Sequence, residues 1–428
     1  MNHNLTGINI YATMGASLSA IVLLSRWITG TTFFIAPEAT LRYGLVAGFS
    51  YSLIGSLTIF AFIFPASTIQ RQCSNKCTLS TFLENKYTDK KGYRLHQWIM
   101  FFVGLTSLYI QVDAGAMLFY AIFHLPLQYG VLLFSVIGLL FYFAVKTPLS
   151  IRHHIYKVAS VLLLLVVLMV YFFILKGVEH IYEGVRLYHP YLFVINNQEL
   201  PYFLLAIFFI FLSQFFLDPT TWDQLPKIEQ RKLKQTFILT GFIWGTIPLS
   251  FFTLIFAVIY TGGFQNVYTI YYDLFQSISS PILFTFVILF LLGAIISTFI
   301  IQISSMVNHF EPQKKLVTIK NTLFGFLFIL SMFYVTKAFQ PTVFQLYFWF
   351  GIIYASSLLP NLWLLFWKGK IGSEVPVIWL MSIFTGFFSK LFYSDNISII
   401  ISVATSGALL LTLYGHRKFL KRGEINEA

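Results

Sequence analysis

The stretch Ser25-Arg26-Trp27-Ile28-Thr29-Gly30-Thr31-Thr32-Phe33 decides the fold, and it lies inside an apolar run from Met14 to Pro37. A membrane-spanning helix should be apolar throughout, because lipid offers no hydrogen-bond partners. Here hydroxyls, a glycine and an arginine crowd the centre of the run. This composition favours a helix that unwinds at membrane depth and turns its freed carbonyls towards a cavity, as in secondary transporters. An ordinary helix with small residues packed against a neighbour is the alternative.

The rest of the chain has the composition of a polytopic membrane protein. Of its 428 residues, 57% are hydrophobic and 10% are charged, and its mean hydropathy is +0.76. Apolar runs of about 20 residues, enough to cross a bilayer, recur along its length. Their unbroken character argues against a β-barrel, and the first run is too long for a cleavable signal peptide. We therefore predict an all-α fold with about twelve transmembrane helices, at 14–36, 43–68, 98–123, 128–146, 155–175, 201–218, 236–261, 278–307, 318–337, 343–366, 375–390 and 396–415.

The basic residues indicate the orientation of these helices. Of the 28 Lys and Arg, 22 lie in the connections on one side of the membrane and in the C-terminal tail, five lie on the other side, and Arg26 lies inside the first span. The positive-inside rule makes that side cytoplasmic, so we expect a plasma-membrane protein with both termini in the cytoplasm. The net charge of +12 thus reflects topology, and we expect no nucleic-acid partner. Cys73 and Cys77 fall in a basic cytoplasmic loop, where free thiols are expected.

The chain is predicted to form one domain made of two inverted five-helix repeats. The sixth span ends in Asp218-Pro219, and the proline disfavours helical geometry at the residue before it. Spans one and six are therefore both interrupted, and a shared site at the membrane midplane is expected. The repeats would cover 14–175 and 201–366, followed by two further helices over 375–415 and a cytoplasmic tail over 416–428. We also expect a short amphipathic helix over 78–87. The external loop over 176–201 is expected to be a connector, and the alternative is that it covers the extracellular entrance.

Polar side chains inside spans are costly, and so they usually face the protein interior or water. Asp113, in the third span, and Arg26 are such residues, and Arg26 is expected to be the only basic residue buried this deeply. The simplest arrangement pairs them, or has both face one hydrated cavity. Such a pair could only fix helix packing, or one member could meet a charged substrate or relay a proton.

Ser297-Thr298 places two adjacent hydroxyls in an otherwise apolar span. Hard cations prefer oxygen ligands of this kind, and carbonyls freed in the first span could complete the shell around Na⁺. The alternative is that both hydroxyls bond back to carbonyls one turn earlier.

Taken together, these pieces resemble the sodium:solute symporter family, which shares the inverted-repeat fold of the bacterial leucine transporter. Five stretches carry the resemblance in the family's order: Ser25–Phe33 with Tyr43-Gly44, Thr78–Tyr87, Gln111–Gly115 with Leu125-Pro126, Asp218–Gln224, and Ala294–Thr298. The resemblance implies a Na⁺ site made of the carbonyls of Ser25, Ile28 and Ala294 and the hydroxyls of Ser297 and Thr298. It also implies a substrate cavity, for which the matched positions are Trp27, Thr32, Ser50, Tyr51, Gln111, Gln214 and Phe215. The intramembrane charges Arg26 and Asp113 are added to these candidates on the ground of their chemistry.

Several positions depart from the family pattern. Arg26 replaces a small neutral residue beside the carbonyls of the sodium site. His154 and Lys157 stand where the family often has an aspartate and a glutamine, and the acidic residue after Ser297-Thr298 is absent. These changes argue against a second sodium ion and favour a divergent member with altered coupling.

We therefore predict a secondary active transporter that couples Na⁺ to the import of a small organic solute by alternating access. Arg26 would suit a carboxylate, so an amino acid or other organic acid is slightly preferred. The alternatives are a proton-coupled or uncoupled carrier, with Asp113 as the proton group, or a sensor that does not transport. We expect no enzyme activity and no cofactor beyond the coupling ion, because the chain has no nucleophile-base pattern, metal-ligand cluster or nucleotide-binding loop.

Overall fold

The computed structural model describes residues 14–72, 78–144, 151–195, 197–263, 267–310 and 319–426. Cys73 and Cys77, and with them the expectation of free thiols, lie outside the described residues. The described chain is all-α, as predicted. Its only extended pairings are isolated bridges between Met14 and Ile228 and between Tyr87 and Ile371.

Nine of the described helical segments are long and apolar enough to cross a membrane. They cover Leu45–Gln72, Lys90–Phe123, Leu127–Ala144, Ile151–Lys176, Leu200–Leu217, Gln230–Ile259, Pro281–Val307, Val343–Phe366 and Asp395–Lys418. The bent pair Ala16–Trp27 and Gly30–Tyr43 makes a tenth when counted as one span, and two shorter apolar helices, Leu327–Phe339 and Glu374–Ser389, coincide with the two remaining expected spans. The exact count of twelve and the repeat boundaries stay predictions.

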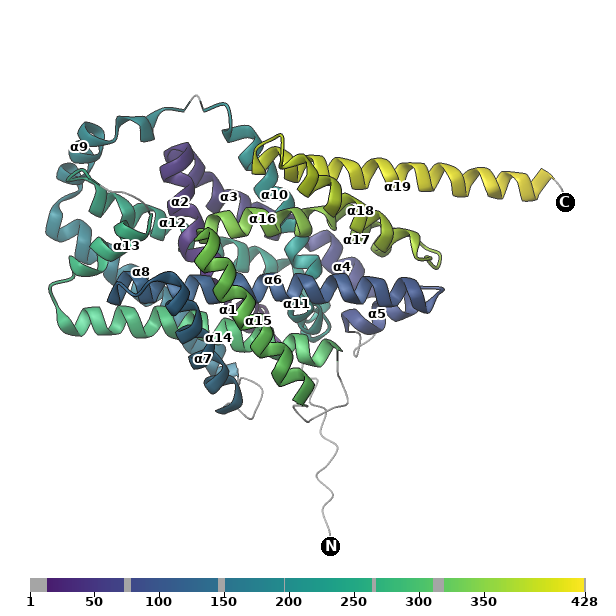
Figure 1. The fold of residues 1–428 in the computed structure, drawn as a ribbon, viewed down its shortest axis with the longest axis horizontal. Coiled ribbons are helices and arrows are strands. Elements are labelled where there is room, and N and C mark those ends of the chain that lie inside the picture. The colour runs from purple at the N-terminus through teal and green to yellow at the C-terminus, as the bar shows by residue number, and fades with distance from the viewer. Residues whose placement is uncertain are drawn as a thin grey trace, which may run out of the picture.

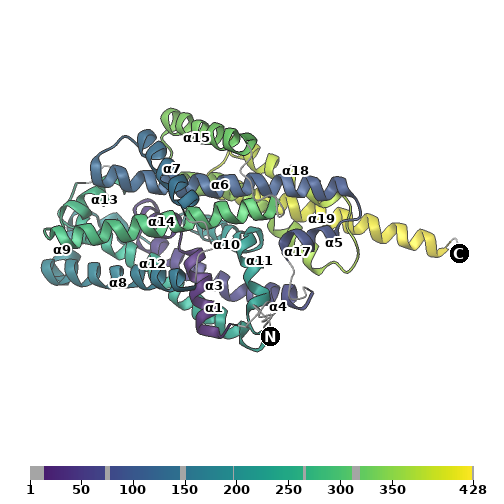
Figure 2. The same ribbon diagram turned by 90° about the horizontal axis from the view of Figure 1, so that it is seen from below.

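Two sets of connecting elements mark the two ends of the bundle. Both views of the ribbon place α9 (Val178–Tyr188) and α13 (Val267–Gln276) at one end, and α4 (Ile63–Gln72) and α5 (Leu79–Lys86) at the other (Figures 1 and 2). The last helix, α19 (Asp395–Asn426), projects from the body beyond the end that holds α4 and α5. The connections predicted to be external and cytoplasmic are thus segregated to opposite ends of the molecule.

The expected amphipathic helix is confirmed as α5, which buries Leu79, Phe82 and Leu83. Thr78 caps it by accepting a hydrogen bond from the backbone N–H of Thr81, as Thr commonly does at helix N-termini. The segment 176–201 contains α9 and a 3₁₀ turn over Pro190–Phe193, and its role as a connector stays a prediction.

The first span is broken, as its composition indicates. Helix α1 (Ala16–Trp27) and helix α2 (Gly30–Tyr43) meet at an angle of 67°. Ile28 and Thr29 are extended between them. The Thr29 N–H donates to the Thr32 hydroxyl at 3.2 Å, which gives α2 a capped start. The break therefore leaves the carbonyls at the end of α1 without their helical partners.

The sixth span is broken at the residue before its proline. Helix α10 (Leu200–Leu217) ends at Asp218, which is extended, and α11 (Pro219–Gln224) begins directly afterwards. The Asp218 carboxylate accepts hydrogen bonds from the backbone N–H groups of Thr220 and Thr221. Proline at the first helical position and aspartate at the N-cap are a favourable combination, so local sequence explains the break.

The remaining helices of the bundle are α3 (Leu45–Ala61), α6 (Lys90–Phe123), α7 (Leu127–Ala144), α8 (Ile151–Lys176), α12 (Leu233–Ile259), α14 (Pro281–Phe310), α15 (Ile319–Phe339), α16 (Val343–Ser356), α17 (Leu358–Phe366) and α18 (Glu374–Ser389). Helix α6 passes close behind the break in the first span. A Cβ on Gly30 would lie 2.2 Å from the Cβ of Ala114. Small residues at this crossing let the two backbones approach, as is typical of membrane helices.

Candidate functional site

A cavity of about 150 Å³ lies beside the two broken helices. Side chains from α1, α2, α6, α10, α11, α12, α14 and α16 contribute to its wall. Aromatic rings form much of its lining, and the Trp27 and Phe215 ring centroids are 4.5 Å apart. A cavity of this volume is known to accept a benzene-sized molecule, so it suits a small solute.

The predicted substrate residues divide into two groups. Those that line the cavity are Arg26, Trp27, Thr32, Gln111, Gln214 and Phe215. The other three, Ser50, Tyr51 and Asp113, are not among the lining residues. Tyr51 is fully buried behind the wall, with its ring 5.1 Å from that of Phe211.

Gln111 holds the start of α2 in place. Its side-chain oxygen accepts a hydrogen bond from the Gly30 backbone N–H at 2.9 Å. The Trp27 carbonyl accepts from the indole N–H of Trp244 at 3.3 Å and from the Thr32 hydroxyl at 3.2 Å. The unwound segment is therefore fixed by side chains from α6 and α12 together with Thr32 of α2.

The residues of the predicted sodium site come together around the ammonium group of Lys157. Lys157 Nζ donates to the Ser25 carbonyl at 2.5 Å, to the Ile28 carbonyl at 3.1 Å and to the Thr298 hydroxyl at 2.6 Å. We call these three acceptors the oxygen cage. An ammonium has three N–H donors and no acceptor, so the cage satisfies it fully.

The other two predicted ligands border the cage. The Thr298 hydroxyl lies 3.0 Å from the Ala294 carbonyl, one turn earlier in α14, and 2.9 Å from the Ile28 carbonyl. Ser297 Oγ lies 2.8 Å from Nε2 of His153. The Thr298 hydroxyl thus contacts a carbonyl one turn earlier in its own helix, as the back-bonding alternative expects. It also contacts the Ile28 carbonyl of the broken span, as a shared cation site would require.

Two histidines support this arrangement from α8. His153 contacts Ser297, and His154 Nδ1 is hydrogen-bonded to the Ser25 hydroxyl. His153, His154 and Lys157 therefore reach α14 and the end of α1 from consecutive turns of one helix. Lys157, with its neighbours, ties the end of α1 to α14 at the point where the first span unwinds.

The prediction that Arg26 is the only deeply buried basic residue is wrong. Lys157 is only 6% exposed, whereas Arg26 remains partly exposed. Lys157 lies only two residues inside the span predicted at 155–175, where a lysine is expected to reach the membrane surface, but α8 already begins at Ile151. The signal that could have identified it was a lysine at the position where the family carries glutamine.

Arg26 contacts α11 instead of Asp113. Its Nη1 donates to the Thr220 carbonyl at 2.9 Å. With the Gln224 amide oriented so that its oxygen faces Arg26, Nη2 donates to that oxygen at 2.9 Å. Its Nε is buried and has no acceptor within the described chain. Arg26 thus joins the two broken spans and keeps one donor beside the cavity.

The expected pairing of Arg26 with Asp113 is wrong. Within the part of the chain that the structure describes, no donor reaches either carboxylate oxygen of Asp113, which is fully buried. Asp113 is two residues from Gln111 on α6, so the two side chains point to nearly opposite faces of the helix. Because Gln111 faces the break, Asp113 faces away from it.

These features place a solute-sized cavity beside two broken spans. Broken spans of this kind are elements that can rearrange in secondary transporters. The Lys157 amino group and its oxygen cage lie at the same junction.

Comparison with known proteins agrees with this geometry. No family model and no curated protein matches the chain. Among solved structures, a Na⁺-coupled sialic acid symporter in a substrate-bound outward-open state is similar at 11% identity, with a TM-score of 0.65 over 93% of this chain and 89% of that one. A manganese transporter from Eremococcus coleocola is similar at 13% identity, with a TM-score of 0.52 over 96% and 95%. Both of these proteins are transporters, and the chain shares their fold.

Proposed function

We propose that this protein is a divergent sodium:solute symporter homologue in which the ammonium of Lys157 takes the place of the coupling sodium ion. The observation that carries the proposal is the set of three hydrogen bonds from Lys157 Nζ to Ser25, Ile28 and Thr298. All three acceptors belong to the ligand set that the resemblance implies for Na⁺. The cation that holds the first span against α14 is then part of the chain.

A tethered cation changes the energetics of transport. A free Na⁺ ion enters from one side and leaves on the other, so its gradient can drive the cycle. The Lys157 ammonium cannot leave, and it therefore contributes stability to the site without drawing on a sodium gradient. Transport would be driven by the solute's own gradient or by protons.

The cavity indicates a small solute with an apolar part and an acidic group. Its wall combines aromatic rings with the buried, unpartnered Nε of Arg26. A guanidinium forms strong, directed bonds with carboxylates. An amino acid or other small organic acid is therefore the proposed class of substrate, carried across the plasma membrane by a chain with both termini in the cytoplasm.

A Na⁺-coupled symporter is the second candidate. Four of the five implied ligands are linked through Lys157 Nζ or the Thr298 hydroxyl, and one similar structure is a Na⁺-coupled symporter; both observations support this candidate. In that case Na⁺ would have to displace Lys157 Nζ from the Ser25 and Ile28 carbonyls. A sensor that binds solute without transporting it would share the same cavity, and it would bind ligand saturably but accumulate none in sealed vesicles.

The proposal predicts that sodium does not stabilise the wild-type protein. A ligand that binds only the folded state raises its stability by about 2.7 kcal/mol at a hundredfold excess over Kd. We expect the melting temperature of the purified protein in detergent to be the same in NaCl and in choline chloride at equal ionic strength. Ser297→Ala should behave like the wild type in this comparison. A higher melting temperature in NaCl that disappears in Ser297→Ala would favour the Na⁺-coupled candidate.

A further inference from the structure

Asp113 is a buried carboxyl group that neither the cavity nor the oxygen cage uses. It is 0% exposed, and no described donor reaches either of its oxygens. An ionised carboxylate that is removed from water without a partner is strongly destabilising, and such a group becomes neutral instead. Asp113 therefore requires a proton in this conformation.

The charged surroundings of Asp113 agree with a neutral carboxyl group. The ionisable groups that interact with it electrostatically are Glu38 on α2, which acts on Asp113, and Tyr268 on α13 and Tyr109 on α6 itself, on which Asp113 acts. Glu38 is an acid and the tyrosines are neutral, so none of these groups supplies a positive charge. The helices α7, α14, α16 and α18 also pack against α6, and no charged group among their described residues acts on Asp113.

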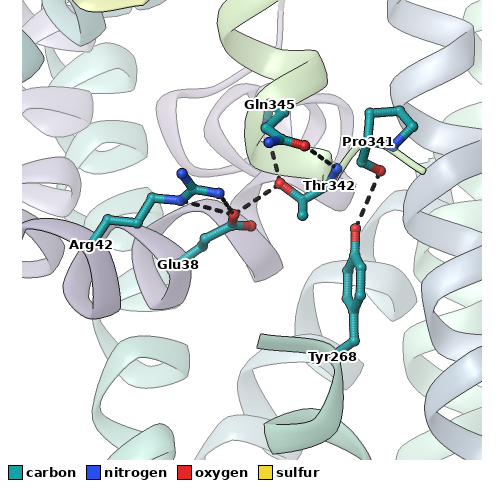
Figure 3. Close-up of polar contacts among 6 residues, drawn as sticks. All are labelled: Glu38, Arg42, Tyr268, Pro341, Thr342 and Gln345. Atoms are coloured by element: carbon teal, nitrogen blue, oxygen red, sulfur yellow. Dashed lines mark hydrogen bonds and ion pairs between the residues drawn. The ribbon is translucent and has the colours of Figure 1, made fainter. Parts of the chain in front are cut away.

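Glu38 connects this region to the end of the bundle that carries α9 and α13. Its Oε1 accepts from Arg42 Nη2 at 2.6 Å and from the Thr342 hydroxyl at 2.8 Å (Figure 3). Glu38 is 4% exposed, whereas the Arg42 side chain is 40% exposed. The ion pair of Arg42 and Glu38 thus leads from a half-exposed arginine to a buried acid that acts electrostatically on Asp113.

The bond between Thr342 and Glu38 also ties the first span to the tenth. Thr342 is the N-cap of α16, and its hydroxyl accepts from the Gln345 N–H at 3.1 Å while donating to Glu38 on α2. Tyr43 and Phe344 pack beside it, with their ring centroids 6.3 Å apart. We call this contact between α2 and α16 the outer clasp, and in the proposed alternating-access cycle we take it as the contact that opens towards that end.

We propose that Asp113 binds a proton when the outer clasp closes and releases that proton to the external solution when the clasp opens. Closing removes water from Asp113, so the carboxylate takes up H⁺ from the outside solution; opening restores water, and the O–H bond ionises again. The inference rests on the proposed alternating-access function. By linkage, a lower external pH favours the closed clasp.

Infrared spectroscopy tests the protonation directly, without a known substrate. The purified wild-type protein at neutral pH should show the C=O stretching band of a protonated carboxylic acid. We expect Asp113→Asn to lose this band, and Glu38→Gln, the matched control on the other acid, to retain it. Because asparagine is a neutral isostere, Asp113→Asn should melt within about 1 °C of the wild type at neutral pH. A wild-type spectrum without the band, or a band that persists in Asp113→Asn, would overturn the proposal.

Hydrogen exchange tests the link to the clasp. With intrinsic rates corrected for pH, the amides of 343–348 in α16 should become more protected as the pH falls. The change should reach up to about tenfold for each pH unit, because one proton is linked to opening. In Asp113→Asn this dependence should vanish, and an unchanged dependence would contradict the link.

The same variants separate this inference from the proposed function. If NaCl stabilises the wild type but not Asp113→Asn, and the carboxylic acid band is absent, Asp113 holds a sodium ion and the proton assignment is wrong. If NaCl stabilises both proteins and the band is present, the proton site stands and the Lys157 proposal fails.

Discussion

Lys157→Met is expected to destabilise the folded protein by about 2–4 kcal/mol. Methionine nearly preserves the length and apolar volume of the side chain but removes all three N–H donors. The Ile28 carbonyl keeps the Thr298 hydroxyl at 2.9 Å, but the Ser25 carbonyl loses the 2.5 Å bond from Nζ. A buried acceptor left without a donor costs about 1–3 kcal/mol, and bonds to a charged group contribute more than neutral ones.

Lys176→Met is the matched control for this variant. Lys176 is the last residue of the same helix, α8, and is more exposed than Lys157. Within the described chain, its Nζ donates a hydrogen bond only to the Ala257 carbonyl, at 2.8 Å. We expect this change to cost less than about 1 kcal/mol, since exposed polar contacts contribute little. Thermal unfolding in detergent, followed by circular dichroism, compares the two variants. Equal melting temperatures for Lys157→Met and Lys176→Met would contradict a structural role for the ammonium.

Asp218→Ala is expected to cost about 2–3 kcal/mol and to loosen the contact between the two broken spans. The Asp218 carboxylate accepts from both the N–H and the hydroxyl of Thr220 and of Thr221. The Thr221 hydroxyl in turn accepts from the Trp27 indole N–H at 3.1 Å. Loss of the carboxylate thus removes the N-cap of α11. It also leaves the Thr221 hydroxyl, which accepts from Trp27, free to rotate.

Two further variants define the Asp218 effect. Asp218→Asn keeps one acceptor oxygen, and so its stability should fall between the wild type and Asp218→Ala. Ser213→Ala, in the same span, removes a hydroxyl that only bonds back to the Phe209 carbonyl, and it should be nearly neutral. Tryptophan fluorescence should report the altered surroundings of Trp27 in Asp218→Ala. If Asp218→Ala unfolds at the wild-type temperature, the cap does not hold the two spans together.

The broken spans could be predicted because local residue chemistry determines them. Hydroxyls and a glycine inside an apolar run identified the first break, and Pro219 identified the second. In both cases the deciding contacts are within a few residues along the chain, such as Thr29 with Thr32 and Asp218 with Thr221. The length and recurrence of the apolar runs were likewise enough to predict the all-α membrane fold.

The ligands of the cage could be named, but not the group that they hold. Lys157 is 129 residues from Ile28 and 141 from Thr298, and its role depends on where α8 begins and which face it turns inwards. From sequence alone, a lysine near the end of a predicted span could lie in a loop at the membrane surface or point into the protein. The direction of the side chain decides between these two positions, and it is set by the packing of α8.

The arrangement of Asp113 was missed for a related reason. Two opposite charges in a membrane suggest a pair, but Gln111 and Asp113 lie on different faces of α6 and only one can face the break. The Gly30 N–H bond selects Gln111. The clasp partner Thr342 lies 304 residues from Glu38, so no local pattern could have indicated that contact.

The central claim is that Lys157 replaces the coupling sodium ion, and the sodium response of Lys157→Ala tests it most directly. Alanine removes the ammonium but leaves the oxygen cage and space for a cation, whereas methionine fills that space. Thermal melting would be measured for the wild type, Lys157→Ala and Lys157→Met in NaCl and in choline chloride. We predict that NaCl stabilises Lys157→Ala alone. Stabilisation of the wild type by NaCl, with no response in Lys157→Ala, would contradict the claim and show that sodium binds with the help of Lys157 or elsewhere.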